Sequence, residues 1–506
     1  MDRWLRARRA WVPNASRGFA CLVVALGVLL ATATAARAAS EGPPWAAWLA
    51  ESGLAPGQVG ALVVPVEGGE PLTALNAAQA FNPASTMKLL TSYASLSMLG
   101  PGYRWRTGAY LRGRLDADVL HGDLVLRGGG DPKLVIEDLD AFVARMRAAG
   151  LREVRGDLVL DDAIYEIGGD SVERFDGDPS QPYNVRPFGV LMNFKAVRVV
   201  IQPDASGGRI RVDPELADLR IDDQIRTVKG PCRHGAAGLA VRDVPEGPGG
   251  PGTGAGAGPR IRVSGNYSPA CGEQSVFTAM LTHPQFVLAL FKAAWRARGG
   301  VFDGGVRVER GAARGTPWAE WESPRTLVEV VGDVNKFSNN VMARHLLLQI
   351  GAESGMRRVG ADSRRPPATV ERARAVVVDW LRGQGLVFPE LVLDNGSGLS
   401  RAERISPASM VRLLQHAHAG PLGEPLRQSL PLVGFDGTMK SRLPGEPVAG
   451  NAWIKTGSLD EVRTIAGYVN AASGRRHAVV LFVNGPRAEG ARPLQDRFLR
   501  WVHANG

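Results

Sequence analysis

Short apolar runs bounded by turn residues lie near both ends of the chain and predict strands. Near the N-terminus, residues 59–66 and 72–76 predict a hairpin. Near the C-terminus, residues 452–458, 464–469 and 477–483 predict three more strands, with a turn at 472–474 before the last. Strands from both ends would join one antiparallel sheet with helices on its faces. The pattern therefore predicts an α+β fold.

Apolar residues at helical spacing predict the helices that cover this sheet. One helix follows the start signal Asn82-Pro83 and ends at Gly100-Pro101. The last helix would carry an apolar face near the C-terminus. Its spaced apolar residues are Leu494, Phe498, Trp501 and Val502, and other helices are expected around 284–298, 325–350, 368–385 and 406–418.

The middle of the chain carries strand signals of its own. The pentapeptide Gly-Asp-Leu-Val-Leu begins at Gly122 and again at Gly156, each time after a turn. Residues 197–201, 209–212 and 260–263 are further strand candidates. The Gly-, Pro- and Ala-rich run 246–259 predicts a flexible loop. A β-rich segment therefore separates the two parts of the expected terminal sheet.

The first 38 residues have the composition of a signal peptide. They combine a basic start, an apolar run at 19–30 and the small-residue site Ala36-Arg37-Ala38. We expect cleavage near Ala38 and export to the periplasm; an uncleaved membrane anchor is the alternative. Removing residues 1–38, with six arginines and one aspartate, leaves a net charge of +5 from the +10 of all 506 residues. So mild a charge excludes a nucleic-acid-binding protein and suits at most peripheral contact with an anionic wall or membrane.

Export leaves two cysteines, Cys232 and Cys271, of the three in the chain. An even pair in an oxidising compartment predicts a disulfide, with two free buried thiols as the alternative. The sequence has neither C-x-x-C nor H-E-x-x-H, and we expect no metal site and no cofactor.

Ser85-Thr86-Met87-Lys88 is the first candidate for chemistry. Of the eight lysines in the chain, only Lys88 has a serine three positions earlier. Residues at i and i+3 share one helix face, so the serine hydroxyl and the amine can meet. A lysine with a lowered pKa can take the proton of such a hydroxyl and make it a nucleophile. An ordinary serine and lysine on the surface of a helix would have the same sequence pattern.

Two more short motifs follow in order. Ser338-Asn339-Asn340 precedes the apolar run 341–350, where Ser and Asn would also serve as ordinary helix caps. Lys455-Thr456-Gly457-Ser458 lies on a predicted edge strand, which suits a substrate with a terminal carboxylate and an oxyanion beside a backbone N–H. A solvent-facing strand end would explain this third motif alone. The ordered combination of all three is much rarer than any one of them.

This combination resembles the penicillin-binding proteins of the D-alanyl-D-alanine carboxypeptidase/endopeptidase type, the low-molecular-mass class C or peptidase S13-like group. Residues 128–132, 394–400 and 436–439 add to the resemblance. It implies a penicillin-recognising serine transpeptidase-like catalytic domain, built from 39–104 and 278–506. The inserted β-rich domain would span 105–277, with a nested subdomain at about 193–265.

The resemblance also implies catalytic roles. Ser85 would be the acylated nucleophile and Lys88 its general base. Ser338 and Lys455 would pass a proton to the leaving amine. The expected partners are peptidoglycan stem peptides, with β-lactams as covalent inhibitors; a homodimer stays open.

The remaining motif residues would hold the substrate. Asn340 would bind the amide of the acyl side, and Thr456, Gly457 and Ser458 would receive the terminal carboxylate. The backbone N–H groups of Ser85 and Ser458 would form the oxyanion hole. The sequence does not decide between a carboxypeptidase and an endopeptidase. A β-lactamase or esterase on this scaffold, and a non-catalytic wall-binding protein, are the alternatives.

Overall fold

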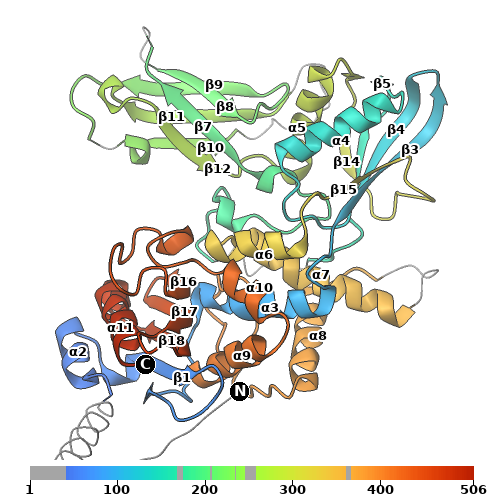
Figure 1. The fold of residues 1–506 in the computed structure, drawn as a ribbon. Helices are drawn as coiled ribbons and strands as arrows, with labels where there is room; N and C mark the ends of the chain where they lie inside the picture. The colour runs from blue at the N-terminus through green and yellow to red at the C-terminus, as the bar shows by residue number, and fades with distance from the viewer. Residues whose placement is uncertain (1–41, 168–174, 205–207, 234, 245–257, 360–365) are drawn as a thin grey trace, which may run out of the picture.

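The computed structural model describes residues 42–167, 175–204, 208–233, 235–244, 258–359 and 366–506. The expected signal peptide and most of the Gly-rich run 246–259 lie outside these residues. Within them, no helix is both long and apolar enough to cross a membrane. Two lobes are visible in Figure 1: a terminal lobe that contains both ends of the described chain, and an inserted lobe above it.

A five-stranded antiparallel sheet forms the centre of the terminal lobe, in the order β16-β17-β18-β1-β2. Strand β1 pairs with β18 along its whole length, so the two ends of the chain meet in one sheet. This confirms the α+β architecture expected from the sequence. The strands are β1 (Val59–Pro65), β2 (Thr73–Leu75), β16 (Ala452–Leu459), β17 (Val462–Asn470) and β18 (Arg476–Asn484).

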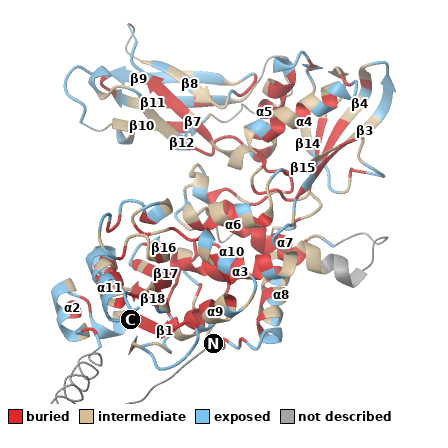
Figure 2. Ribbon diagram, in the orientation of Figure 1, coloured by how far each residue is buried: buried red, intermediate tan, exposed pale blue. Residues whose placement is uncertain are grey.

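Helices cover both faces of this sheet because its strands are apolar on both sides. In β18, Val479 and Leu481 pack toward α2 and α11, whereas Val480 and Phe482 pack toward the larger helical layer. Figure 2 shows the sheet buried between these layers. The helices are α2 (Trp45–Ser52), α3 (Lys88–Leu99), α6 (Leu327–Lys336), α7 (Asn340–Val359), α8 (Val370–Gly383), α9 (Pro407–Ala419), α10 (Gly423–Ser429) and α11 (Arg492–Asn505).

The single helix expected at 325–350 is two helices, α6 and α7. Ser338 between them has a φ of 56°, a conformation that cannot continue a right-handed helix. The side chain of Asn339 then accepts a hydrogen bond from the backbone N–H of Met342 at 3.0 Å and caps α7. The break holds Ser338 at the junction of the two helices.

A seven-stranded sheet with two helices forms the base of the inserted lobe. The two copies of Gly-Asp-Leu-Val-Leu become parallel neighbours in it, with Leu124 opposite Leu158. A side chain at Gly156 would collide with the Gly122 carbonyl at 2.5 Å, so this glycine permits the close pairing. The elements are β3 (Arg106–Asp116), β4 (Val119–Gly128), α4 (Ile136–Ala148), β5 (Glu153–Val154), β6 (Leu158–Asp161), α5 (His283–Ala297), β13 (Val301–Phe302), β14 (Val306–Val308) and β15 (Ala319–Glu322).

Two three-stranded sheets form the nested part of the inserted lobe. The predicted disulfide is present between Cys232 and Cys271, which are 39 residues apart in sequence. The strands are β7 (Val197–Gln202), β8 (Arg209–Asp213), β9 (Arg220–Thr227), β10 (Leu239–Asp243), β11 (Arg260–Tyr267) and β12 (Gln274–Thr278).

The sequence placed the end of the insertion near 278 and the end of its nested subdomain near 265. Sheet pairing favours a later end for both. Helix α5 packs in the core of the inserted lobe, and β15 pairs with β3, so residues 283–322 belong with that lobe. Strand β12 pairs with β7, which carries the nested part on to Thr278. Periodicity identifies a strand but not its distant partner. We therefore propose an insertion of about 105–322 with a nested subdomain of about 197–278.

Candidate active site

Ser85 lies where a short 3₁₀ turn, η2 (Ala84–Met87), runs directly into α3. Lys88 is the first residue of α3, and its Nζ donates to Ser85 Oγ at 3.0 Å. A 3₁₀ turn places side chains at i and i+3 one above the other. The structure thus brings the predicted pair into direct contact.

The Lys88 amine is fully buried. It also donates to Asn340 Oδ1 at 2.6 Å and to the backbone carbonyl of Ser397. Burial lowers the pKa of Lys88 well below its ordinary value, and the positive charges of Lys455 and Arg344 add to this effect. A neutral amine has a lone pair that can accept the serine proton.

A second serine–lysine pair faces the same site. Lys455 Nζ on β16 donates to Ser338 Oγ at 2.9 Å and to the Thr456 carbonyl at 2.8 Å. Burial lowers the pKa of Lys455 to about 7. Because its charge also acts on Lys88, the protonation states of the two amines are coupled.

Strand β16 is an edge strand, and it approaches the backbone of Ser85 at Gly457. A Cβ added to Gly457 would lie 2.8 Å from the Ser85 backbone nitrogen, so glycine is required for this approach. Thr456 Oγ1 donates to Thr438 Oγ1 at 2.9 Å. Ser458 is exposed beside them on the same strand. The third motif therefore lines the free edge next to the nucleophile.

A glycine-rich loop, residues 394–400, closes the site from the other side. The Ser397 carbonyl accepts from Lys88, and Gly398 packs against the start of η2 with a φ of +80°. A Cβ on Gly398 would lie 1.9 Å from the Ala84 carbonyl oxygen. In the sequence, residues 394–400 were noted only as part of the family resemblance, and no role was predicted for them.

Glu403 holds this loop in place, and no sequence motif pointed to it. Its Oε1 accepts from the backbone N–H groups of Asn395 at 3.1 Å and Gly396 at 3.0 Å. Its Oε2 is buried and has no hydrogen-bond partner among the described residues. Desolvation raises the pKa of Glu403 to about 7. A single buried glutamate cannot be recognised from the spacing of residue types in the sequence, because its hydrogen-bond partners are backbone groups.

The structure thus gathers the predicted catalytic residues into two hydrogen-bonded groups. Lys88 binds Ser85 and Asn340, and Lys455 binds Ser338. Thr456, Gly457 and Ser458 lie on the adjoining strand edge. The disulfide lies elsewhere, in the nested part of the inserted lobe. Among the described residues, no cluster of three or more His, Cys, Asp or Glu side chains could hold a metal ion.

Known proteins resemble this chain over most of its length. The D-Ala-D-Ala carboxypeptidase 3 (S13) family matches residues 46–504. A D-alanyl-D-alanine carboxypeptidase of Actinomadura sp. is 29% identical over 459 residues, which cover 86% of this chain and 79% of the relative. The D-alanyl-D-alanine carboxypeptidase DacB of Haemophilus influenzae is 24% identical over 407 residues, covering 79% and 80%.

A solved structure shares the fold. The crystal structure of penicillin binding protein 4 (dacB) from Haemophilus influenzae superposes with a TM-score of 0.70 at 22% identity, covering 87% of this chain and 96% of that one. With the fold, both serine–lysine pairs and a family match over nearly the whole described chain, the protein belongs to the D-Ala-D-Ala carboxypeptidase 3 (S13) family and is an enzyme of that peptidase class.

Proposed function

We propose that the protein is a periplasmic serine DD-peptidase that acts through an acyl-enzyme on Ser85. The observation that carries the proposal is the 3.0 Å contact between Ser85 Oγ and the buried Lys88 amine. Its relatives are named D-alanyl-D-alanine carboxypeptidases, which supports a peptide ending in D-Ala-D-Ala as the substrate.

Acylation begins with proton transfer from Ser85 Oγ to neutral Lys88. The hydroxyl oxygen attacks the carbonyl carbon of the penultimate D-alanine, and a tetrahedral oxyanion forms. The backbone N–H groups of Ser85 and Ser458 donate to this oxyanion. Close packing of Gly457 against the Ser85 nitrogen supports this role, since it brings the strand edge beside the nucleophile.

Collapse of the tetrahedral intermediate requires a proton for the leaving amine. Ser338 delivers it, with Lys455 as the source. A lysine whose pKa is about 7 can give up and regain a proton near neutral pH. The proton that Lys88 took from Ser85 replaces the one that Lys455 gave up, so Lys88 is neutral again. Water then enters, gives a proton to Lys88 as it attacks the ester, and this proton returns to Ser85 Oγ as the ester breaks.

Substrate orientation comes from three side chains around these groups. Asn340 binds the amide on the acyl side, while Thr456 and Ser458 bind the carboxylate beside the scissile bond. If D-alanine leaves, the enzyme is a carboxypeptidase. If the D-centre of a neighbouring diaminopimelate leaves, the same step cuts a cross-link. β-Lactams would acylate Ser85 by the same route, and a β-lactam complex of the Haemophilus influenzae protein supports this.

Mass analysis of products from purified muropeptides tests the proposal. We expect loss of D-alanine from pentapeptides, conversion of cross-linked dimers to monomers, or both, and no reaction with Ser85→Ala. A D-Ala-D-Ala peptide amidated at its C-terminus should react about ten- to a hundredfold more slowly in kcat/KM than the free acid, because charge-assisted bonds are lost. Equal cleavage of the amide and the acid would contradict the carboxylate-binding role of Thr456 and Ser458. Rapid turnover of penicillin with no peptide cleavage would contradict a DD-peptidase.

A further inference from the structure

A cavity of about 1010 Å³ lies between the two lobes, away from the motif residues. One wall comes from the segment around β3 and the end of β4, and a second from the loop 310–314. The third wall is the later half of α7, at Gln349, Ala352 and Glu353. None of the residues assigned above to catalysis or substrate binding lines it.

Arginines dominate the charge of this cavity. Arg106 is neutralised by Glu320 and Glu322. Two others donate to backbone carbonyls and not to carboxylates: Arg104 to the Ser323 carbonyl at 3.0 Å and Arg310 to the Tyr165 carbonyl at 3.1 Å.

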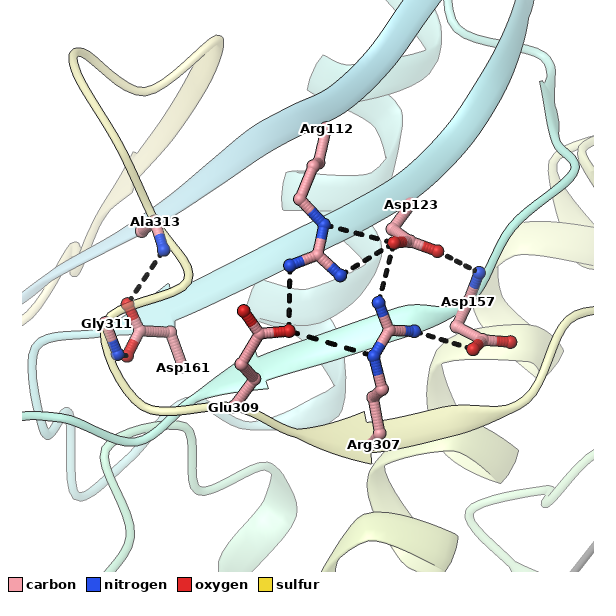
Figure 3. Close-up of polar contacts among 8 residues, drawn as sticks. All are labelled: Arg112, Asp123, Asp157, Asp161, Arg307, Glu309, Gly311 and Ala313. Carbon is pink, nitrogen blue, oxygen red and sulfur yellow. Dashed lines mark hydrogen bonds and ion pairs between the residues drawn. The ribbon is translucent and has the colours of Figure 1, made fainter.

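Arg127 and Arg314 are the most available of the lining arginines. Both are exposed, and within the described residues neither makes an ion pair. Other arginines on the same sheet differ. Figure 3 shows Arg112 and Arg307 each held by carboxylates, among them Asp123 at 2.7 Å from both. The cavity therefore has a net positive charge, whereas the arginines on the neighbouring surface are neutralised by carboxylates.

The arginine-bearing loop 310–314 is anchored from beneath. Asp161, a buried carboxylate on β6, accepts from the backbone N–H groups of Gly311 at 2.7 Å and Ala313 at 3.0 Å (Figure 3). These bonds fix the backbone between Arg310 and Arg314. A preformed wall loses little entropy when a ligand binds.

A hydrogen-bonded network joins the cavity to α7. Tyr165 donates to Gln349 Oε1 at 2.7 Å, and Gln349 donates to the Tyr103 hydroxyl at 2.8 Å. Tyr103 in turn donates to Glu353 Oε1 at 2.8 Å. Because α7 begins at Asn340 and rises about 1.5 Å per residue, this wall lies about 14–20 Å along the helix from the catalytic groups.

We propose that this cavity binds an acidic peptide segment of the same wall polymer whose D-Ala-D-Ala end or cross-link is cut at Ser85. The inference rests on the proposed function for the identity of the polymer. An extended peptide rises about 3.4 Å per residue, so about four to six residues span the separation. The lining also contains the Glu353 carboxylate, which suits a peptide with amino and carboxylate groups better than a polymer of phosphates alone.

Binding of a fluorescein-labelled tetraglutamate peptide, followed by fluorescence anisotropy, tests the cavity directly. The variant R127E/R314E removes the two available arginines. The matched control R114E/R382E makes the same charge change at exposed arginines outside the cavity. We expect the wild type to bind in a salt-sensitive manner and the cavity variant to bind about tenfold or more weakly, with the control close to wild type.

Three results would overturn the inference. They are no binding by the wild type, equal weakening in both double variants, and stronger competition by tripolyphosphate than by unlabelled tetraglutamate. The last would assign the cavity to a phosphate polymer.

Hydrolysis rates separate this inference from the proposed function. With R127E/R314E, we expect an unchanged rate on a small acyl-D-Ala-D-Ala peptide and a lower kcat/KM on a cross-linked muropeptide. If the wild type cleaves the small peptide and both variants cleave the muropeptide equally well, the cavity site is wrong and the peptidase stands. If the wild type cleaves neither, the proposed function fails, while the anisotropy result still decides whether the cavity binds acidic peptides.

Discussion

Activation of Ser85 depends on a single buried amine. Lys88 has its low pKa because it is desolvated and faces two other cations. Lys88→Arg keeps the positive charge but cannot act as a base, because a guanidinium does not deprotonate in proteins. We expect the rate of acylation by a fluorescent penicillin to fall on the order of 10²–10⁴. Lys229→Arg, at an exposed position, should acylate like the wild type.

Acylation of Lys88→Arg at nearly the wild-type rate would mean that Lys88 is a structural cation. A thermal melt of both variants guards against loss of fold as the explanation.

Glu403 gives the fold a pH dependence of a definite sign. Its pKa is raised from 4.5 to about 7 by burial, so the folded state disfavours the ionised carboxyl. The resulting loss of unfolding free energy is absent below about pH 4.5, grows as pH rises, and is complete above about pH 7. Glu403→Gln cannot ionise, so its stability does not undergo this loss. We expect the stability of Glu403→Gln relative to the wild type to increase by about 3 kcal/mol over this range.

Denaturant unfolding of both proteins at several pH values measures that difference. A difference that stays constant with pH would show that Glu403 is not titrating in this window.

At the scale of elements, the spacing between the loop 394–400 and η2 fixes the nucleophile. Gly398→Ala combines a positive φ with a Cβ that would collide with the Ala84 carbonyl. Gly385→Ala has a similar φ of +73° but nothing within 4 Å of its Cβ. Both variants should lose about 1 kcal/mol of stability from the backbone strain. Only Gly398→Ala should also lose penicillin acylation, measured by gel fluorescence.

Equal acylation by the two glycine variants would contradict the role of this contact in placing Ser85.

The disulfide belongs to the nested part of the inserted lobe and should act there. A closed loop of 39 residues stabilises by about 4 kcal/mol in the chain-entropy model. In Cys232→Ser/Cys271→Ser, hydrogen exchange should accelerate in β7–β12, while acylation at Ser85 stays at the wild-type rate. Unchanged exchange in these strands would show that the bridge does not stabilise them.

Elements whose signals are local were predicted well from the sequence. The terminal hairpin, the three C-terminal strands and the α3 helix all have short-range periodicity and turn residues, and all are present. The range 325–350 was expected as one helical region, although Ser and Asn at 338–340 were also recognised as possible caps for a helix at 341–350, and Asn339 does cap α7. The positive φ of Ser338 was not expected, because no residue pattern in the sequence indicates it.

At the scale of the whole molecule, the sequence could place motifs but not contacts. The order of the three motifs was enough to expect them in one site. The Ser397 carbonyl, Glu403 and the Gly398 contact depend on chain segments about 300 residues from Ser85, or on backbone atoms, and no pattern reports these. For the same reason the end of the insertion was placed at 278, since pairing of β15 with β3 joins strands about 200 residues apart. The functional roles of the site residues stay predictions.

The central claim is that Ser85 is the acylated nucleophile. Incubation of the protein with benzylpenicillin, followed by intact-mass measurement and peptide mapping, tests it most directly. One covalent adduct should form, the peptide containing Ser85 should carry it, and Ser85→Ala should give none. An adduct on another residue, or labelling that survives Ser85→Ala, would contradict the account.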